Sequence, residues 1–154
     1  MIRYQHTQVG KLNLFALGLA GSWTLAAGLF LGLPRPFDLF TIGLGGLFLI
    51  LGLLFFSLRI QVDGEGIRIA FGPGIISRSW ALGDCVSARQ VRTSLIDGWG
   101  VKLTRDGWLY SVARPHAVRI RLTNGACVLL GTDEPEVLLA ALLEAGLDLE
   151  QEPR

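Results

Sequence analysis

Side chains able to support catalysis or hold a metal are few in this chain of 154 residues. The only histidines are His6 and His116, and the only cysteines are Cys85 and Cys127. These residues do not combine with Asp or Glu at the spacing of a zinc site. The sequence also lacks a phosphate-binding loop, a nucleophile elbow and a dinucleotide fingerprint. We therefore predict no catalytic, cofactor-binding or metal-binding residues, and a protein that is not an enzyme.

Aromatic side chains gather in the stretch DGWGVKLTRDGWLY. If Gly98–Leu103 and Trp108–Val112 are the arms of a hairpin with a two-residue loop, the strand period of two puts Trp99, Trp108 and Tyr110 on one face. We expect this face, which also carries Val101, Leu103 and Val112, to belong to a sheet core. An odd-length loop would turn one arm over and leave an exposed aromatic platform for a ligand.

Basic residues are unevenly distributed. Residues 59–122 contain ten basic and five acidic side chains, whereas residues 123–154 contain one and seven. Three interpretations remain: ordinary solvated strand faces, contact with anionic lipid, and attraction to the acidic end of another copy. Nucleic acid is not expected as a partner, because the net charge is only +1. The candidate contact residues of this face are Arg89, Arg92, Lys102, Arg105, Arg114, Arg119 and Arg121, with Leu109 as a further outer-face position.

The N-terminal third has the composition of a membrane segment. Between Lys11 and Arg59 the only charged residues are Arg35 and Asp38. Two uncharged runs, 12–33 and 39–58, are each long enough to cross a hydrocarbon core of about 30 Å. A signal peptide and a soluble helical bundle both fit less well, because the first run is too long and neither run has a polar face. We predict two transmembrane helices.

The flanking charges predict the orientation of these helices. Arg3 and Lys11 precede the first run and Arg59 follows the second, whereas the connecting turn carries Arg35 alone. The positive-inside rule then places both termini in the cytoplasm, where the cysteines would stay reduced. Rows of small residues favour close packing of the two helices on each other or on a neighbouring subunit: Gly18, Ser22 and Ala26; Gly28 and Gly32; Gly43, Gly45, Gly46 and Gly52.

From Arg59 onward the hydrophobic period changes to two. About seven short strands follow without an intervening helix, which excludes a parallel βαβ fold. At Thr123-Asn124-Gly125 an Asn-Gly turn with a two-residue loop would place Ile120 opposite Leu129 on the inner face. Val128 and Leu130 would then point outward and need a cover from a helix, a subunit or the membrane segment, so they join the candidate interaction surface.

An amphipathic helix ends the domain. The capping-box pattern predicts Asp133 as its N-cap, with Pro135 in the first turn and Glu136 three residues after the cap. Gly146 ends the helix. The predicted fold is a strongly bent antiparallel sheet or partly open barrel, closed at one end by this helix.

The order of these motifs resembles the bacterial pleckstrin-homology-like domains of small membrane proteins. The likeness rests on LRIQVDGEGIRIAFG, on GWG…GWLY and on RIRLTNGACVLLGTDEPEVLLAAL, and covers residues 58–146. It implies a seven-stranded bent sheet capped by a C-terminal helix, with no general catalytic set. Eukaryotic relatives often bind phosphoinositides near the first hairpin, but here that turn is acidic, with Asp63 and Glu65.

Together these features predict an N-terminal tail and two transmembrane helices within residues 1–58, a cytoplasmic pleckstrin-homology-like domain over 59–146 and a C-terminal tail over 147–154. The expected function is a non-enzymatic module for protein–protein interaction or self-assembly at the cytoplasmic face of the bacterial inner membrane. Its expected partners are the lipid bilayer and either a second copy or another membrane protein. The alternative is a sensor that binds anionic lipid through the basic strand face, and a third hypothesis is an enzyme or enzyme subunit without identifiable site residues.

Overall fold

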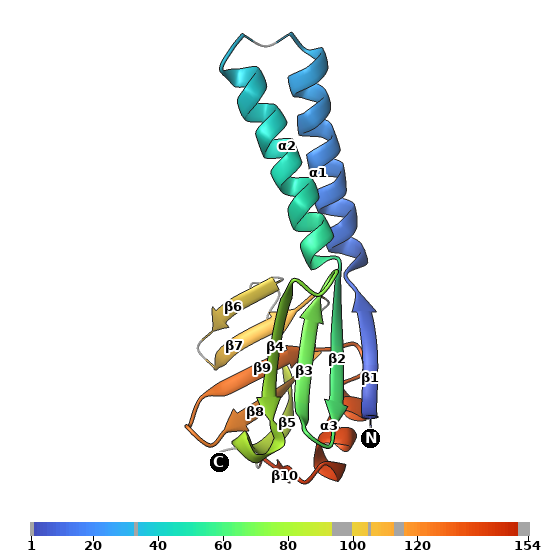
Figure 1. Cartoon of the computed structure of the whole chain (residues 1–154), viewed down its shortest axis with the longest axis vertical. Helices are drawn as coiled ribbons and strands as arrows, with labels where there is room; N and C mark the ends of the chain where they lie inside the picture. The colour runs from blue at the N-terminus through green and yellow to red at the C-terminus, as the bar shows by residue number, and fades with distance from the viewer. Residues whose placement is uncertain (1, 33, 94–99, 105, 113–115, 151–154) are drawn as a thin grey trace.

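The computed structural model describes residues 2–32, 34–93, 100–104, 106–112 and 116–150. A pair of long helices, α1 (Lys11–Phe30) and α2 (Phe37–Phe55), projects from a two-sheet domain (Figure 1). Both helices are long and apolar enough to cross a membrane, and little of either is buried inside the molecule. They start and end within a few residues of the predicted runs 12–33 and 39–58.

The two helices pack through glycines. A Cβ atom added at Gly45 would lie 2.7 Å from the backbone nitrogen of Leu25, and one at Gly21 would lie 2.9 Å from the Leu49 side chain. Only glycine allows so close an approach. The expected row Gly18–Ser22–Ala26 does not serve this contact, because a Cβ at Gly18 meets nothing within 4 Å.

The first sheet has the order β1-β2-β3-β4. Its strands are β1 (Ile2–Val9), β2 (Ser57–Asp63), β3 (Gly66–Phe71) and β4 (Ile76–Ala81). Strand β1 pairs antiparallel with β2, so the chain segments before α1 and after α2 are neighbours in one sheet. Residues 2–9, predicted as part of a tail, are therefore an integral strand of the domain.

The second sheet has the order β10-β5-β8-β9-β7-β6. Its strands are β5 (Cys85–Arg92), β6 (Gly100–Thr104), β7 (Gly107–Ser111), β8 (His116–Leu122), β9 (Cys127–Gly131) and the short β10 (Asp148–Leu149). A 3-10 turn, η1 (Leu82–Asp84), links the two sheets. Most pairs are antiparallel as predicted, but β7–β9 and β10–β5 are parallel.

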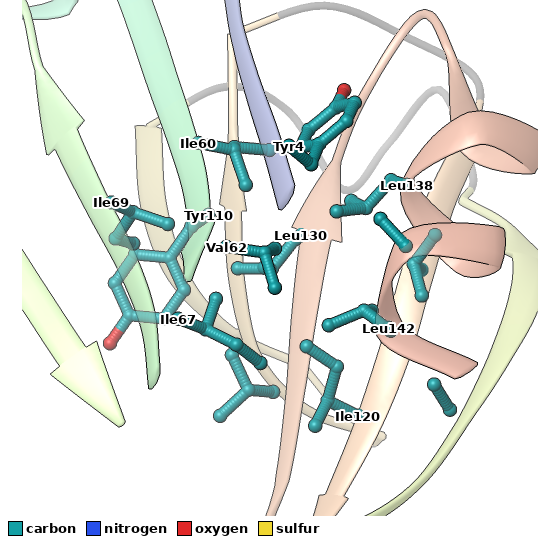
Figure 2. Close-up of a cluster of buried hydrophobic side chains, with 14 of the residues drawn as sticks. Tyr4, Ile60, Val62, Ile67, Ile69, Tyr110, Ile120, Leu130, Leu138 and Leu142 are labelled. Carbon is teal, nitrogen blue, oxygen red and sulfur yellow. The ribbon is translucent and has the colours of Figure 1, made fainter. Parts of the chain in front are cut away.

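The core lies between the sheets and under helix α3 (Pro135–Glu144). Figure 2 shows Ile60, Val62 and Ile67 of the first sheet opposite side chains of the second sheet and of α3. Those opposing side chains include Ile120, Leu130, Leu138 and Leu142, all fully or almost fully buried.

The β8–β9 turn corrects the predicted register. Gly125 adopts φ +80°, and the backbone N–H of Leu122 donates to the carbonyl of Ala126 at 2.8 Å, which makes the loop three residues long. Ile120 consequently faces Val128 and not Leu129. Since a slip of one residue exchanges the two faces of a strand, Val128 and Leu130 lie in the core. The prediction that they form an interaction surface is wrong.

The start of α3 also differs from prediction. The N-cap position is Glu134, without a side-chain cap, and the backbone N–H of Glu134 donates to Thr132 Oγ1 at 3.1 Å. Asp133 instead contacts His6 of β1, with Oδ1 2.8 Å from Nε2. The carboxylate thus ties β1 to the helix and does not cap it.

Candidate functional site: a groove and two groups of arginines

The β6–β7 hairpin has the predicted two-residue loop. Val101 pairs with Tyr110 and Leu103 with Trp108, so their side chains share one face as expected. Tyr110 is buried against Trp80 and Phe71, with ring centroids 5.6 Å and 6.4 Å apart. Trp99 lies outside the described residues.

Burial of this face stops partway along the hairpin. Trp108 is 47% exposed and Leu103 is 63% exposed. The reason lies in the opposite sheet, which ends at β4 and does not reach over this part of β6 and β7. The prediction that Trp108 fills the core is therefore wrong, although its side chain is on the predicted face.

An open groove of about 500 Å³ occupies the place where the two sheets diverge. Its walls come from the end of α2, from edge strand β4 and from the β6–β7 hairpin, which lie close together at the base of the helices (Figure 1). Four of its seven lining side chains are aromatic, and one is charged. They are Phe55, Ile76, Arg78, Trp80, Val101, Trp108 and Tyr110. We call this the aromatic groove.

Two of the three strands that border the aromatic groove, β4 and β6, are sheet edges. Strand β4 pairs only with β3, and β6 pairs only with β7, among the strands that the structure describes. An edge strand presents backbone N–H and C=O groups that another extended chain can pair with. The groove therefore combines an apolar floor with two potential pairing edges.

Three of the predicted basic residues meet on the outer face of the second sheet. Glu150, which directly follows β10, lies 3.6 Å from Arg89 Nε, 3.9 Å from Arg119 Nε and 3.3 Å from Arg121 Nη2. Its side chain is only 12% exposed. We call these four residues the distal cluster, because β10 lies at the end of the domain away from the helices (Figure 1).

The other predicted basic residues do not join this cluster. Arg92 and Lys102 are exposed on their strands, and Arg105 and Arg114 lie outside the described residues. Leu109, predicted on the outer face, is buried there against Ala117 and Leu129.

Two further arginines, absent from the predicted set, lie on the first sheet. Arg59 lines a second groove of about 520 Å³ on the outer side of this sheet, whereas Arg78 is opposite Ile69 and shares the inner face of β4 with Ile76 and Trp80. Arg59 and Arg78 form no ion pair or hydrogen bond with any residue that the structure describes. Arg68, which also lines this groove, is instead 2.7 Å from Glu65. We call Arg59 and Arg78 the proximal pair, since they come from strand ends near the helices.

The described residues offer little chemistry for catalysis. They contain no group of three or more His, Cys, Asp or Glu side chains arranged to hold a metal ion. Burial, assisted by Asp84, raises the pKa of the Cys85 thiol to about 11, so this residue is protonated at neutral pH and is a poor nucleophile. Arg119 donates to Cys127 Sγ at 3.2 Å, and this bond raises the pKa of Arg119.

Sequence reasoning missed the groove residues Phe55, Ile76 and Trp80 as well as the proximal pair. The alternation Ile76-Arg78-Trp80 does show that these three side chains share one face of β4. It cannot show that the face lies at a sheet edge. Comparison with protein-family models and with curated proteins gives no match.

Proposed function

We propose that the protein is a membrane-anchored, non-enzymatic binding module that holds an extended segment of a partner protein in its aromatic groove. The observation that carries the proposal is the incomplete burial of the inner face of the β6–β7 hairpin. Val101, Leu103 and Trp108 are apolar, lie on one face and are partly or largely exposed.

The composition of the groove favours a protein segment. Exposed aromatic side chains in a concave site are the usual anchors of protein interfaces. An extended segment could also add main-chain hydrogen bonds along β4 or β6 while its alternate side chains occupy the apolar floor. Arg78 at the rim favours a partner with an acidic side chain beside its apolar ones.

The membrane arrangement belongs to the same proposal. In it, α1 and α2 cross the bacterial inner membrane as a hairpin with both termini in the cytoplasm. The pairing of Val9 with Ser57 supports a common side for both helix ends, because those residues flank the helices. Lys11 and Arg59 at these ends, against Arg35 alone in the turn, favour the cytoplasmic side.

The pleckstrin-homology-like identity of the domain is likewise proposed. It is supported by the order of the elements, in which short strands form two facing sheets and a C-terminal helix follows the last hairpin. A domain of this kind acts by presenting surfaces, and the aromatic groove is the most apolar of the described grooves on the two sheets.

Photocrosslinking in native membranes tests the groove. A photoreactive side chain at Val101 or Leu103 of the full chain should capture a defined partner peptide, and the same group at the exposed Leu149 of the opposite end should not. The captured peptide, made synthetically, should bind the purified chain, and Trp108→Ser should weaken that binding by about tenfold or more. Equal capture at Leu149, or binding that is indifferent to Trp108→Ser, would refute the proposal.

A further inference from the structure

The β3–β4 turn, residues 72–75, packs against the end of α2. Gly72 adopts φ +48°, and a Cβ atom added to it would lie 2.6 Å from the carbonyl oxygens of both Leu53 and Leu54. Only glycine fits so close to other backbone atoms in this conformation. The two carbonyls belong to the last turn of α2, which ends at Phe55. The β3–β4 turn therefore lies directly at the helix end, at the base of the two helices (Figure 1).

The two helices have little length to spare for crossing a bilayer. At a rise of about 1.5 Å per residue, the 20 residues of α1 span about 30 Å and the 19 residues of α2 about 29 Å. The hydrocarbon core has a thickness of about 30 Å, and the polar interface adds roughly 5–7 Å on each side. The end of an inserted α2 then lies at the boundary of the hydrocarbon core. The β3–β4 turn, which contacts that end, lies in the polar interface.

The surface of the β3–β4 turn is apolar. Its sequence is Gly-Pro-Gly-Ile, and Ile75 is 75% exposed. The other connections between strands that the structure describes in full contain polar side chains: Glu65 between β2 and β3, Asp84 between β4 and β5, and Asn124 between β8 and β9. The one apolar connection in this set is thus the one at the helix end, whereas the acidic β2–β3 turn lies at the opposite end of the same sheet (Figure 1).

The backbone N–H groups of the two glycines in the turn are paired within the protein. Gly72 donates to the carbonyl of Ser57 at 2.9 Å, and Gly74 donates to the carbonyl of Phe71 at 2.7 Å. Pro73 between them has no N–H group. A backbone donor without a partner is costly away from water. These three residues can therefore leave bulk water without exposing an unpaired donor to lipid.

We propose that the β3–β4 turn inserts into the interfacial region of the bilayer, with Ile75 as the side chain that contacts lipid. The inference rests on the proposed crossing of the membrane by α1 and α2, but it does not depend on a partner in the aromatic groove. The turn adds a third contact with the leaflet beside the two helix ends. This contact restricts tilting of the two-sheet domain, so that the aromatic groove keeps a constant height above the membrane surface.

Spin labelling of the full chain in phosphatidylcholine–phosphatidylglycerol nanodiscs tests the insertion. A nitroxide at Ile75→Cys should collide more often with lipid-soluble oxygen than with a water-soluble nickel chelate. We expect the oxygen-to-nickel ratio to be severalfold higher there than at Ile2→Cys, an exposed position paired with the far end of β2. Leu47→Cys, exposed within α2, gives the value for the hydrocarbon core. The labelled parent chain measures the background from Cys85 and Cys127.

A pair of glycine variants tests the contact between the turn and α2. The carbonyls at the end of a helix point along its axis, here toward the domain. In the labelled Ile75→Cys chain, Gly72→Ala should therefore push the turn away from the bilayer and lower the oxygen-to-nickel ratio. The matched control is Gly74→Ala, because Gly74 also has positive φ, at +93°, but its added Cβ meets nothing within 4 Å. Equal ratios in the two variants would contradict the assignment of the depth to this contact.

The contrary results can be told apart. A ratio at Ile75 equal to that at Ile2, with Leu47 in lipid, would overturn the insertion of the turn and leave the membrane arrangement standing. Rare collisions with both reagents at Ile75 would mean that protein, such as a second copy, covers the turn in place of lipid. A low ratio at Leu47 would refute the membrane crossing and this inference with it. Failure of the aromatic groove to capture a partner would leave all of these ratios unchanged.

Discussion

The distal cluster and the proximal pair are both groups of arginines on the strands of the two sheets, but their surroundings differ. In the distal cluster three guanidinium groups lie within 3.3–3.9 Å of one largely buried carboxylate, that of Glu150. In the proximal pair, Arg59 and Arg78 have no acidic partner among the described residues. The first group holds the C-terminal segment against β5 and β8. The second is available for a ligand.

This difference shows why the local charge count misleads. The excess of basic residues in the strands and of acidic residues after residue 122 suggested attraction between copies of the chain. The structure places part of that attraction within one chain, where Glu150 returns to the basic strands. What matters for binding is the charge left after such internal pairing.

The largest effect should come from removing the shared carboxylate. Glu150→Gln leaves Arg89 partly buried without its acidic partner and leaves Arg119 with only Asp106, whose Oδ1 is 4.0 Å from Nη1. We expect the free energy of unfolding to fall by about 2 kcal/mol. That is less than the roughly 3–5 kcal/mol for a fully buried pair, because Arg121 is half exposed. Denaturation of the full chain measures the loss. Glu144→Gln, on the exposed side of α3, is the control; equal stability of the two variants would contradict the role of the cluster.

A smaller loss of stability is expected from changes in the acidic turn of Asp63 and Glu65. This turn pairs with Arg68, whose charge is less fully compensated than in the distal cluster and more so than in the proximal pair. The backbone N–H groups of Glu65 and Gly66 donate to Asp63 and lower its pKa. The stabilisation is therefore present above the usual pKa of aspartate and is lost as pH falls through the lowered value. Asp63→Ala should reduce stability at neutral pH and flatten this acid-dependent loss. Unfolding measured across acidic pH, with Glu65→Gln as control, checks the prediction; an unchanged slope would refute it.

Arg121→Gln should cost less than about 1 kcal/mol, because its guanidinium is half exposed and surface ion pairs contribute little. The difference from the parent chain should shrink as salt is added, since solvent screens this outer member of the cluster. Melting curves at low and high ionic strength provide the measurement. A larger loss than that of Glu150→Gln would reverse the expected order.

The smallest effect on stability belongs to the proximal pair. Arg59→Gln and Arg78→Gln should each change the free energy of unfolding by no more than about 0.5 kcal/mol, since neither side chain has a partner to lose. The same denaturation experiment applies. A loss as large as that of Glu150→Gln would mean that these arginines are structural, and the contrast between the two groups would disappear.

Much of the fold could be predicted because hydrophobic period and turn chemistry are local properties. The two long helices and the β6–β7 register follow from them. Strand β1 was missed because its inward positions, Tyr4, His6 and Gln8, are not an apolar series. They are held by polar contacts that other segments provide, such as the bonds from His6 to Asp133 and from Gln8 to the carbonyl of Gly131.

At the β8–β9 turn, a difference of one residue in loop length separates the predicted register from the observed one. Asn124-Gly125 is compatible with a two-residue loop, and the structure has a three-residue loop with Gly125 at positive φ. That single residue decides whether Val128 and Leu130 face solvent or the core. Both turn types satisfy the local sequence, so only burial against the opposite sheet and α3 selects between them.

The sequence by itself determined which side chains share a face, where the apolar helices lie and where chain direction reverses, because these depend on neighbours along the chain. Tertiary structure alone decided which faces are covered. Trp108 and Tyr110 are two residues apart in β7 and share one face, yet only Tyr110 is covered by the other sheet. Glu150 and the arginines follow the same rule: which charges are neutralised depends on segments that meet only when the two sheets and the C-terminal strand assemble.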